Sequence, residues 1–214
     1  GTLVIPAFSL ERTQVLIYEM NNLFENKVIK SIPVYIDSPL ATKITEVYKD
    51  GQEMFNEKTK EQIRNGDDIF SFKELTYTHS SEDSKALERV PGPKIIIAGS
   101  GMSVGGRVIR HEEIYLPDQN STILLVGYQT LGTIGRHLLD GDKKIVIHRN
   151  TIKVKAKIES ILGYSSHKDS DHLVELVSQA SDTLKKAFVV MGEYKSATFL
   201  SQRIKDELNI NTVC

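Results

Sequence analysis

Cysteine is almost absent from this chain of 214 residues, and tryptophan is missing altogether. The single cysteine, Cys214, cannot form a disulfide within the chain, so we expect a reducing compartment, the cytoplasm. No apolar run approaches the ~20 residues of a membrane helix, so we expect no membrane association. The start, Gly1–Pro6, lacks the charged leader and apolar core of a signal peptide. Both ends carry strand-like patterns without an initiating Met, so we expect a fragment of a longer protein.

An excess of charge of either sign is also missing. The chain has 27 Lys and Arg against 28 Asp and Glu, a formal net charge of −1. This balance argues against a nucleic-acid binder held mainly by a basic surface, although it leaves room for a local basic groove. With 40% hydrophobic and 26% charged residues, the chain reads as a soluble globular protein of one large or two small domains.

Short apolar runs alternate with helical patterns in the first part of the chain. The run Lys94–Ala98 is apolar almost throughout and ends at a glycine, which is typical of a buried parallel strand. The other expected strands are Thr2–Ile5, Pro33–Ile36 and Thr122–Val126, and the expected helices are Leu10–Glu25 and one that opens with Thr42–Tyr48. Strands separated by helices predict an α/β fold, a doubly wound and mostly parallel sheet with helices on both faces.

The pattern changes near Gly141, where we place a domain boundary between residues 1–140 and 141–214. Lys144–His148 and Thr151–Lys157 predict a hairpin. A helix from about Asp169, a strand at Ala187–Val190 and a last helix follow; the apolar positions of that last helix are Ala197, Leu200, Ile204 and Leu208. Residues 51–90 are polar and predict irregular helices in a surface excursion. Strands without sheet neighbours would leave an exposed edge, so we also expect a homodimer or strand exchange.

Two glycine-rich segments follow predicted strands. Gly99–Gly106 is compatible with a nucleotide site, a phosphate-contacting loop or a structural turn, but it has no acidic residue at the spacing of a dinucleotide fingerprint. It also fails the pattern of a serine-hydrolase nucleophile elbow. Gly127–Arg136 ends in an arginine whose planar group suits phosphate. Two such turns at one edge of a parallel sheet indicate a ligand site there.

Residues 163–172 hold the third candidate. The string from His167 to His172 resembles part of the metallo-β-lactamase ligand string His-x-His-x-Asp-His, with Asp169 where a histidine is required. The alternative is structural: Ser166 and His167 in a turn, Asp169 near a helix N-cap and His172 on that helix. The remaining histidines, such as His111, have no spacing that suggests a metal site.

Together these segments resemble the β-CASP family of metallo-β-lactamase nucleases, in the family's order and over nearly the whole chain. Ile32–Ala41, for example, reads IPVYIDSPLA where the family reads iPvyldSplA. The other matching segments are Ile5–Arg12, Gly101–Arg107, Gly127–Arg136 and Gly163–Asp169. Among the family's members the chain is most similar to RNA-processing enzymes of the cleavage and polyadenylation specificity factor type.

The resemblance implies a metal-dependent ribonuclease acting on single-stranded RNA, with residues 1–140 as its β-CASP cap and residues 141–214 as a returning part of the lactamase-like domain. His167 matches a catalytic histidine near the scissile phosphate. Arg107, Arg136 and Ser166 are expected RNA contacts by position, and Lys168 is one by its place beside His167.

Metal binding is the point at which the sequence departs from the family. Zinc is the cofactor expected for the whole protein, but its main ligand string has no counterpart here, so we expect no bound metal and no activity in this chain alone. Met191 stands where the family has a metal-binding histidine, and a thioether is a weak zinc ligand. The alternative is a non-catalytic RNA-processing scaffold with a degraded metal site.

Overall fold

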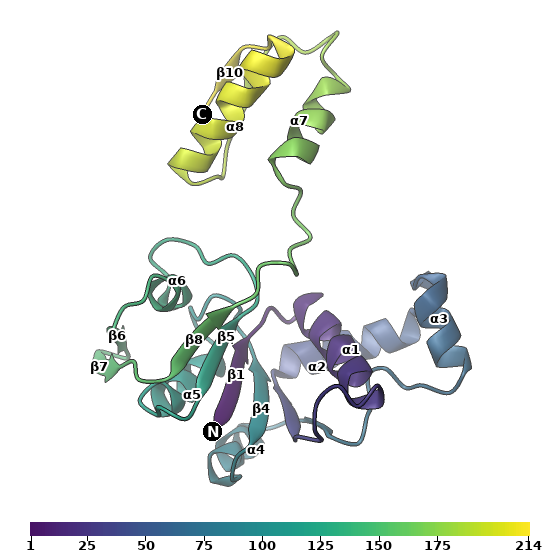
Figure 1. The fold of residues 1–214 in the computed structure, drawn as a ribbon, viewed down its shortest axis with the longest axis vertical. Coiled ribbons are helices and arrows are strands. Elements are labelled where there is room, and N and C mark those ends of the chain that lie inside the picture. The colour runs from purple at the N-terminus through teal and green to yellow at the C-terminus, as the bar shows by residue number, and fades with distance from the viewer. The chain divides into compact units, whose positions relative to one another are not determined.

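A six-stranded parallel sheet organises the first part of the chain in the computed structural model, which describes residues 1–214 (Figure 1). Its strand order is β3-β2-β4-β1-β5-β8, and every neighbouring pair is parallel. The strands are β1 (Thr2–Pro6), β2 (Val34–Asp37), β3 (Leu75–Tyr77), β4 (Lys94–Ala98), β5 (Thr122–Leu125) and β8 (Lys157–Ser160). The predicted α/β class with a mostly parallel sheet is therefore confirmed.

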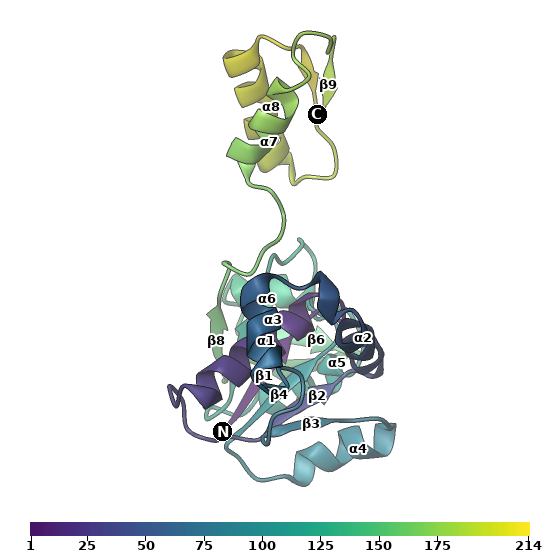
Figure 2. The same cartoon turned by 90° about the vertical axis from the view of Figure 1, so that its right-hand side faces the viewer.

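Helices cover both faces of this sheet, as the predicted doubly wound fold requires (Figure 1, Figure 2). The helices are α1 (Arg12–Glu25), α2 (Pro39–Asp50), α3 (Glu57–Arg64), α4 (Ser81–Ala86), α5 (Val108–Tyr115) and α6 (Ile134–Leu139), with short 3-10 turns η1 (Gln52–Met54) and η2 (Leu87–Arg89). Side chains of β4 alternate between two cores. Ile96 packs with α5 and α6 on one face, and Ile97 packs with α1 and α2 on the other.

A small antiparallel hairpin lies between α6 and the last strand of the sheet. It consists of β6 (Lys144–Ile147) and β7 (Asn150–Lys153), so the predicted hairpin is confirmed. The expected second strand was too long, however, because the chain leaves the hairpin after Lys153 and pairs with β5 as β8. The alternation of apolar and polar residues continues through this corner, where the backbone N–H groups of Lys155 and Ala156 both donate to the carbonyl of Leu116. Periodicity alone could not reveal the change of partner strand.

The chain divides into two compact units, Gly1–Ser165 and Ser166–Cys214. The second unit contains α7 (Ser170–Ser178), β9 (Ala187–Phe188), α8 (Tyr194–Leu208) and β10 (Thr212–Val213). Its core lies between the two helices and the parallel pair β9–β10, and the predicted apolar face of the last helix packs there. The predicted boundary near residue 140 separates the β-CASP segment from the lactamase-like segment, which is a different division from that into compact units, and it stays a prediction. No helix is long and apolar enough to span a membrane.

Candidate functional site

The carboxyl ends of β1, β2 and β4 meet at one edge of the sheet and surround a cleft of about 460 Å³. Ser9, Ser38, Ser100 and Arg107 contribute polar groups to its lining, beside apolar side chains such as Phe8. The Ser9 and Ser38 hydroxyls lie 3.0 Å apart, and Ser38 also caps α2 by accepting from the Ala41 N–H at 3.2 Å. Ligands collect at this edge in parallel α/β sheets, which makes the cleft a candidate binding site.

Asp37, the last residue of β2, is fully buried beneath the cleft and accepts hydrogen bonds on both carboxylate oxygens. Thr78 Oγ1 and Arg107 Nη1 approach Oδ1 at 2.6 and 2.7 Å. Ser84 Oγ and His111 Nε2 approach Oδ2, each at 2.6 Å. Burial raises the pKa of Asp37, but the hydrogen bonds from His111, Ser84, Thr78 and Arg107 outweigh it and hold the pKa well below its usual range. Asp37 is therefore a carboxylate at every physiological pH.

This carboxylate fixes the position of Arg107, one of the predicted RNA contacts. Nη1 of Arg107 also donates to Thr78 Oγ1 at 3.0 Å, so one end of the guanidinium group is held by two acceptors. The side chain remains 22% exposed at the cleft. A guanidinium group has five N–H donors, so donors remain for a ligand. Arg107 is thus held in place before any ligand binds.

The first glycine-rich turn, Gly99–Gly106, is closed by its own backbone. The Ser100 N–H donates to the Gly105 carbonyl, and the Val104 N–H donates to Ser100 Oγ at 3.1 Å. Gly106 has φ of 73°, and an added Cβ would lie 2.5 Å from the Gly99 carbonyl oxygen, so glycine is required there. Ser103 is fully buried and donates to the carboxyl group of Glu112 on α5.

Glu112 is a second fully buried carboxyl group near the first turn. Its Oε2 atom is buried without a hydrogen-bond partner, and Ser103 is its one side-chain donor. Burial raises the pKa of Glu112 to about 7, and the hydrogen bond from Ser103 offsets only part of that effect. Glu112 therefore changes protonation near neutral pH.

The second glycine-rich turn is tied to the first. Gln129 is buried and donates through Nε2 to the Gly101 carbonyl at 3.0 Å, and the Gly135 N–H donates to the Met102 carbonyl at 3.3 Å. A Cβ at Gly135 would lie 1.9 Å from Gln129 Oε1, so only glycine permits this contact. The expectation that both turns lie at one sheet edge is confirmed. Arg136, in the first turn of α6, is paired with Asp140 at 2.9 Å.

The remaining predicted site residues belong to the second unit. Ser166, His167 and Lys168 are exposed and precede α7. Asp169 caps α7 by accepting from the His172 N–H at 2.9 Å, and its carboxylate also lies 2.7 Å from His172 Nδ1. The structural alternative for this string, an N-cap at Asp169 followed by a helix carrying His172, matches the observed geometry.

The donors in this chain do not fit a zinc site on their own. In neither unit do three or more His, Cys, Asp or Glu side chains come together in a way that could hold a metal ion. Asp169 and His172 form only a pair. Met191 is fully exposed in a turn after β9, with φ of 68°. A zinc centre would therefore need ligands beyond those that these residues supply.

Sequence reasoning missed the polar network beneath the cleft. His111 was given no role because it has no metal-ligand spacing, yet it binds Asp37 from 74 positions away. Glu112 and Ser103 were also overlooked. One signal was available for Asp37, which directly follows a predicted strand and precedes a Ser-Pro helix start. Nothing local in the sequence identifies its four hydrogen-bond donors.

Two family models match the chain. The Beta-Casp domain matches residues 13–138, and the Zn-dependent metallo-hydrolase RNA specificity domain matches residues 151–214. The chain is 30% identical over 175 residues to Ribonuclease TTHA0252 of Thermus thermophilus, a match that covers 82% of this chain and 40% of that protein. It is 32% identical over 200 residues to the RNase J-like protein of Methanocaldococcus jannaschii, covering 93% and 45%.

A third relative is Integrator complex subunit 11 of Gallus gallus, 28% identical over 215 residues, with 99% of this chain and 34% of that protein covered. The chain thus spans less than half the length of each of these relatives.

Proposed function

The chain belongs to the β-CASP family of metallo-β-lactamase-fold nucleases, and from this premise we propose that it supplies the RNA-binding surface and one proton-transferring residue of a metal-dependent ribonuclease. The observation that carries the proposal is the cleft at the carboxyl edge, which the first glycine-rich turn lines and where Asp37 holds Arg107. A fixed guanidinium group with donors left over suits the phosphates of single-stranded RNA.

Each predicted site residue has a separate task in this proposal. Arg107 and Arg136 bind backbone phosphates at the sheet edge, and Ser166 and Lys168 do so beside His167. The His167 imidazole transfers a proton at the phosphodiester, because an imidazole can accept and donate protons near neutral pH. In the whole protein, a zinc site would activate water and stabilise charge on the phosphoryl group. Since these residues do not form that site, we expect the 214-residue chain to bind RNA without cleaving it.

Replacement of His167 tests the catalytic assignment. In the longer protein that contains this chain, we expect His167→Ala to slow cleavage of end-labelled single-stranded RNA by about 10²–10⁴-fold, the usual contribution of an acid–base group, with little change in RNA affinity. His172→Ala is the matched control, because His172 is engaged with Asp169 at the helix start. Unchanged cleavage by the His167 variant would exclude this role.

A scaffold function is the second candidate, and Met191 is the observation that favours it. A methionine replaces the histidine expected from the family's motif, and its side chain is fully exposed. On this proposal the longer protein binds RNA within a processing complex but does not cut it. Metal analysis of the purified longer protein distinguishes the two candidates, because two bound zinc ions per chain would rule out the degraded site.

A further inference from the structure

A strongly basic stretch surrounds the β6–β7 hairpin, in contrast to the chain's net charge of −1. Residues 143–157, here called the basic hairpin, contain six Lys or Arg and no Asp or Glu. The six cations, all exposed, are Lys143, Lys144, Arg149, Lys153, Lys155 and Lys157. Lys157 is paired with Glu159 at 2.7 Å, whereas no ion pair neutralises the other five. A local field of one sign attracts an anionic partner even when the whole chain is neutral.

Two of these lysines face each other in a way that costs stability. Lys144 and Lys153 are directly opposite in the antiparallel register, and the adjacent pair, Ile145 and Ile152, turns to the core on the other face. Like charges directly opposite each other destabilise a strand pair. A bound polyanion would remove this repulsion.

The hairpin tip carries a second cost. The two loop residues, His148 and Arg149, both have positive φ, 48° and 67°. Such two-residue turns favour Asn-Gly, because these residues tolerate the left-handed conformation. A cationic Arg149 therefore occupies a position for which glycine is the more stable choice.

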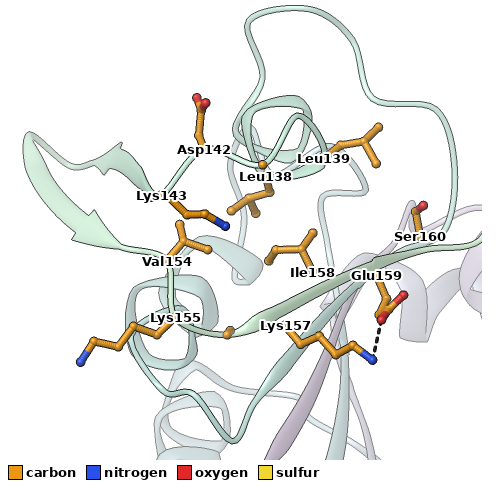
Figure 3. A pocket seen from close by; sticks show the side chains of 12 residues that line it. Leu138, Leu139, Asp142, Lys143, Val154, Lys155, Lys157, Ile158, Glu159 and Ser160 are labelled. Atoms are coloured by element: carbon orange, nitrogen blue, oxygen red, sulfur yellow. Dashed lines mark ion pairs between the residues drawn. The ribbon is translucent and has the colours of Figure 1, made fainter.

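A pocket of about 450 Å³ with a mixed polar and apolar lining lies beside the basic hairpin (Figure 3). Val154 and Ile158 contribute apolar side chains to its lining, and Asp142, Lys143 and Glu159 contribute charged ones. Its lining shares no residue with the cleft at the carboxyl edge. Unpaired ammonium groups suit the phosphates of a nucleic-acid chain, and the apolar side chains beside them suit its bases, whereas a purely acidic peptide would use only the charges.

We propose that the basic hairpin and its pocket form a second contact for single-stranded RNA, separate from the carboxyl-edge cleft. Lys143, Lys144, Arg149, Lys153 and Lys155 hold backbone phosphates, and the apolar side chains of Val154 and Ile158 contact a base. This inference rests on the proposed RNA-binding function and adds a surface to it. The two structural costs at the hairpin are then explained by binding, because cations stand where the fold alone disfavours them.

The test measures RNA binding and stability on the same variants of the 214-residue chain. Fluorescence anisotropy with a labelled single-stranded RNA across a potassium chloride series gives affinity and salt dependence. For Lys144→Gln/Lys153→Gln we expect binding about tenfold weaker and a slope of log affinity against log salt smaller by roughly 1.4, because two phosphate contacts are lost. The same variant should melt about 1–2 °C higher, since the like-charge pair is gone.

Two further variants complete the design. Arg149→Gly should also weaken binding and raise the melting temperature, because glycine accepts positive φ. Lys30→Gln/Lys58→Gln is the matched control: it removes two exposed lysines elsewhere in the first unit, and neither is in an ion pair. We expect its affinity, salt slope and melting temperature to match those of the unmodified chain.

The outcomes separate this inference from the function on which it rests. If the unmodified chain does not bind RNA, both proposals are overturned. If it binds RNA and Lys144→Gln/Lys153→Gln behaves like the control, only the basic hairpin assignment is wrong. Poly-glutamate represents an acidic protein partner and is added as a competitor of the RNA. Displacement of RNA by poly-glutamate at equal charge concentration would assign the surface to acidic proteins and overturn the RNA assignment.

Discussion

Asp37 and Glu112 are both fully buried carboxyl groups, but they differ in the number of side chains that donate hydrogen bonds to them. Four side chains donate to Asp37, and the pKa of its carboxyl group lies well below the usual range despite burial. Glu112 receives one side-chain hydrogen bond, from Ser103, and burial raises its pKa to about 7. At equal depth the two pKa values are therefore shifted in opposite directions, and the number of donors accounts for the difference.

The two acids also support different parts of the candidate site. Asp37 holds Arg107 at the cleft, and Glu112 holds Ser103 inside the first glycine-rich turn. Helix α5 connects them, because its neighbouring residues His111 and Glu112 serve one network each. One network is permanently charged and the other titrates near neutrality, so a pH change acts on the turn and not on the arginine.

The largest expected effect comes from Asp37→Asn. The amide cannot satisfy the four donors and leaves Arg107 without its counter-charge, so we expect the free energy of unfolding to fall by about 3–5 kcal/mol. Urea denaturation at pH 8 measures it, beside Glu112→Gln, a substitution of similar burial that should not lower the unfolding free energy at this pH. An unfolding free energy of Asp37→Asn equal to that of the wild type would break the comparison.

We expect the unfolding free energies of Glu112→Gln and the wild type to differ by an amount that depends on pH and reaches about 3 kcal/mol. The native pKa of Glu112, about 7, lies above its ordinary value of 4.5. The stability that the protonated acid contributes is therefore full below about pH 4.5 and is lost as pH rises to about 7. Glutamine does not ionise, so the variant should exceed the wild type by about 3 kcal/mol at pH 8 and match it at pH 4.5.

Asp37 cannot cause this pH dependence. Its lowered pKa gives stability that is present above the unfolded value, near 3.9, and is lost only as pH falls through the native value. Urea denaturation of Glu112→Gln and wild type between pH 4.5 and pH 8 therefore isolates Glu112. If the difference in unfolding free energy between them stays constant across this range, the pKa of Glu112 is not raised in the folded protein.

The smallest expected effects come from removing single donors. At pH 8 we expect Ser103→Ala to lower the unfolding free energy by about 1.5–3 kcal/mol, because an ionised Glu112 loses its one side-chain donor. Ser84→Ala should cost about 1 kcal/mol, since Asp37 keeps three donors. Denaturation of both variants in one buffer provides the test, and equal losses would contradict the dependence on donor number.

The sequence predicted those features that depend on neighbours along the chain. Lys94–Ala98 was recognised as a buried strand because its apolar run is continuous, and the structure places it at the same residues. Leu75–Tyr77 was missed because a three-residue edge strand in a polar stretch carries too little pattern. The pairing of Asp37 with His111 could not be predicted, since it depends on how β2 and α5 meet after folding.

The position of strand β8 determines where the chain can be joined to another protein without disrupting the sheet. It falls inside the segment matched by the RNA specificity domain, yet it completes the sheet begun by the Beta-Casp segment. A chimera joined near residue 150, between the two family segments, would lose the native outermost strand of that sheet. Strand β5 would then be an exposed edge that can pair with another chain. A chimera joined after Ser165 would keep the sheet whole, so the unit of inheritance and the unit of folding end at different residues.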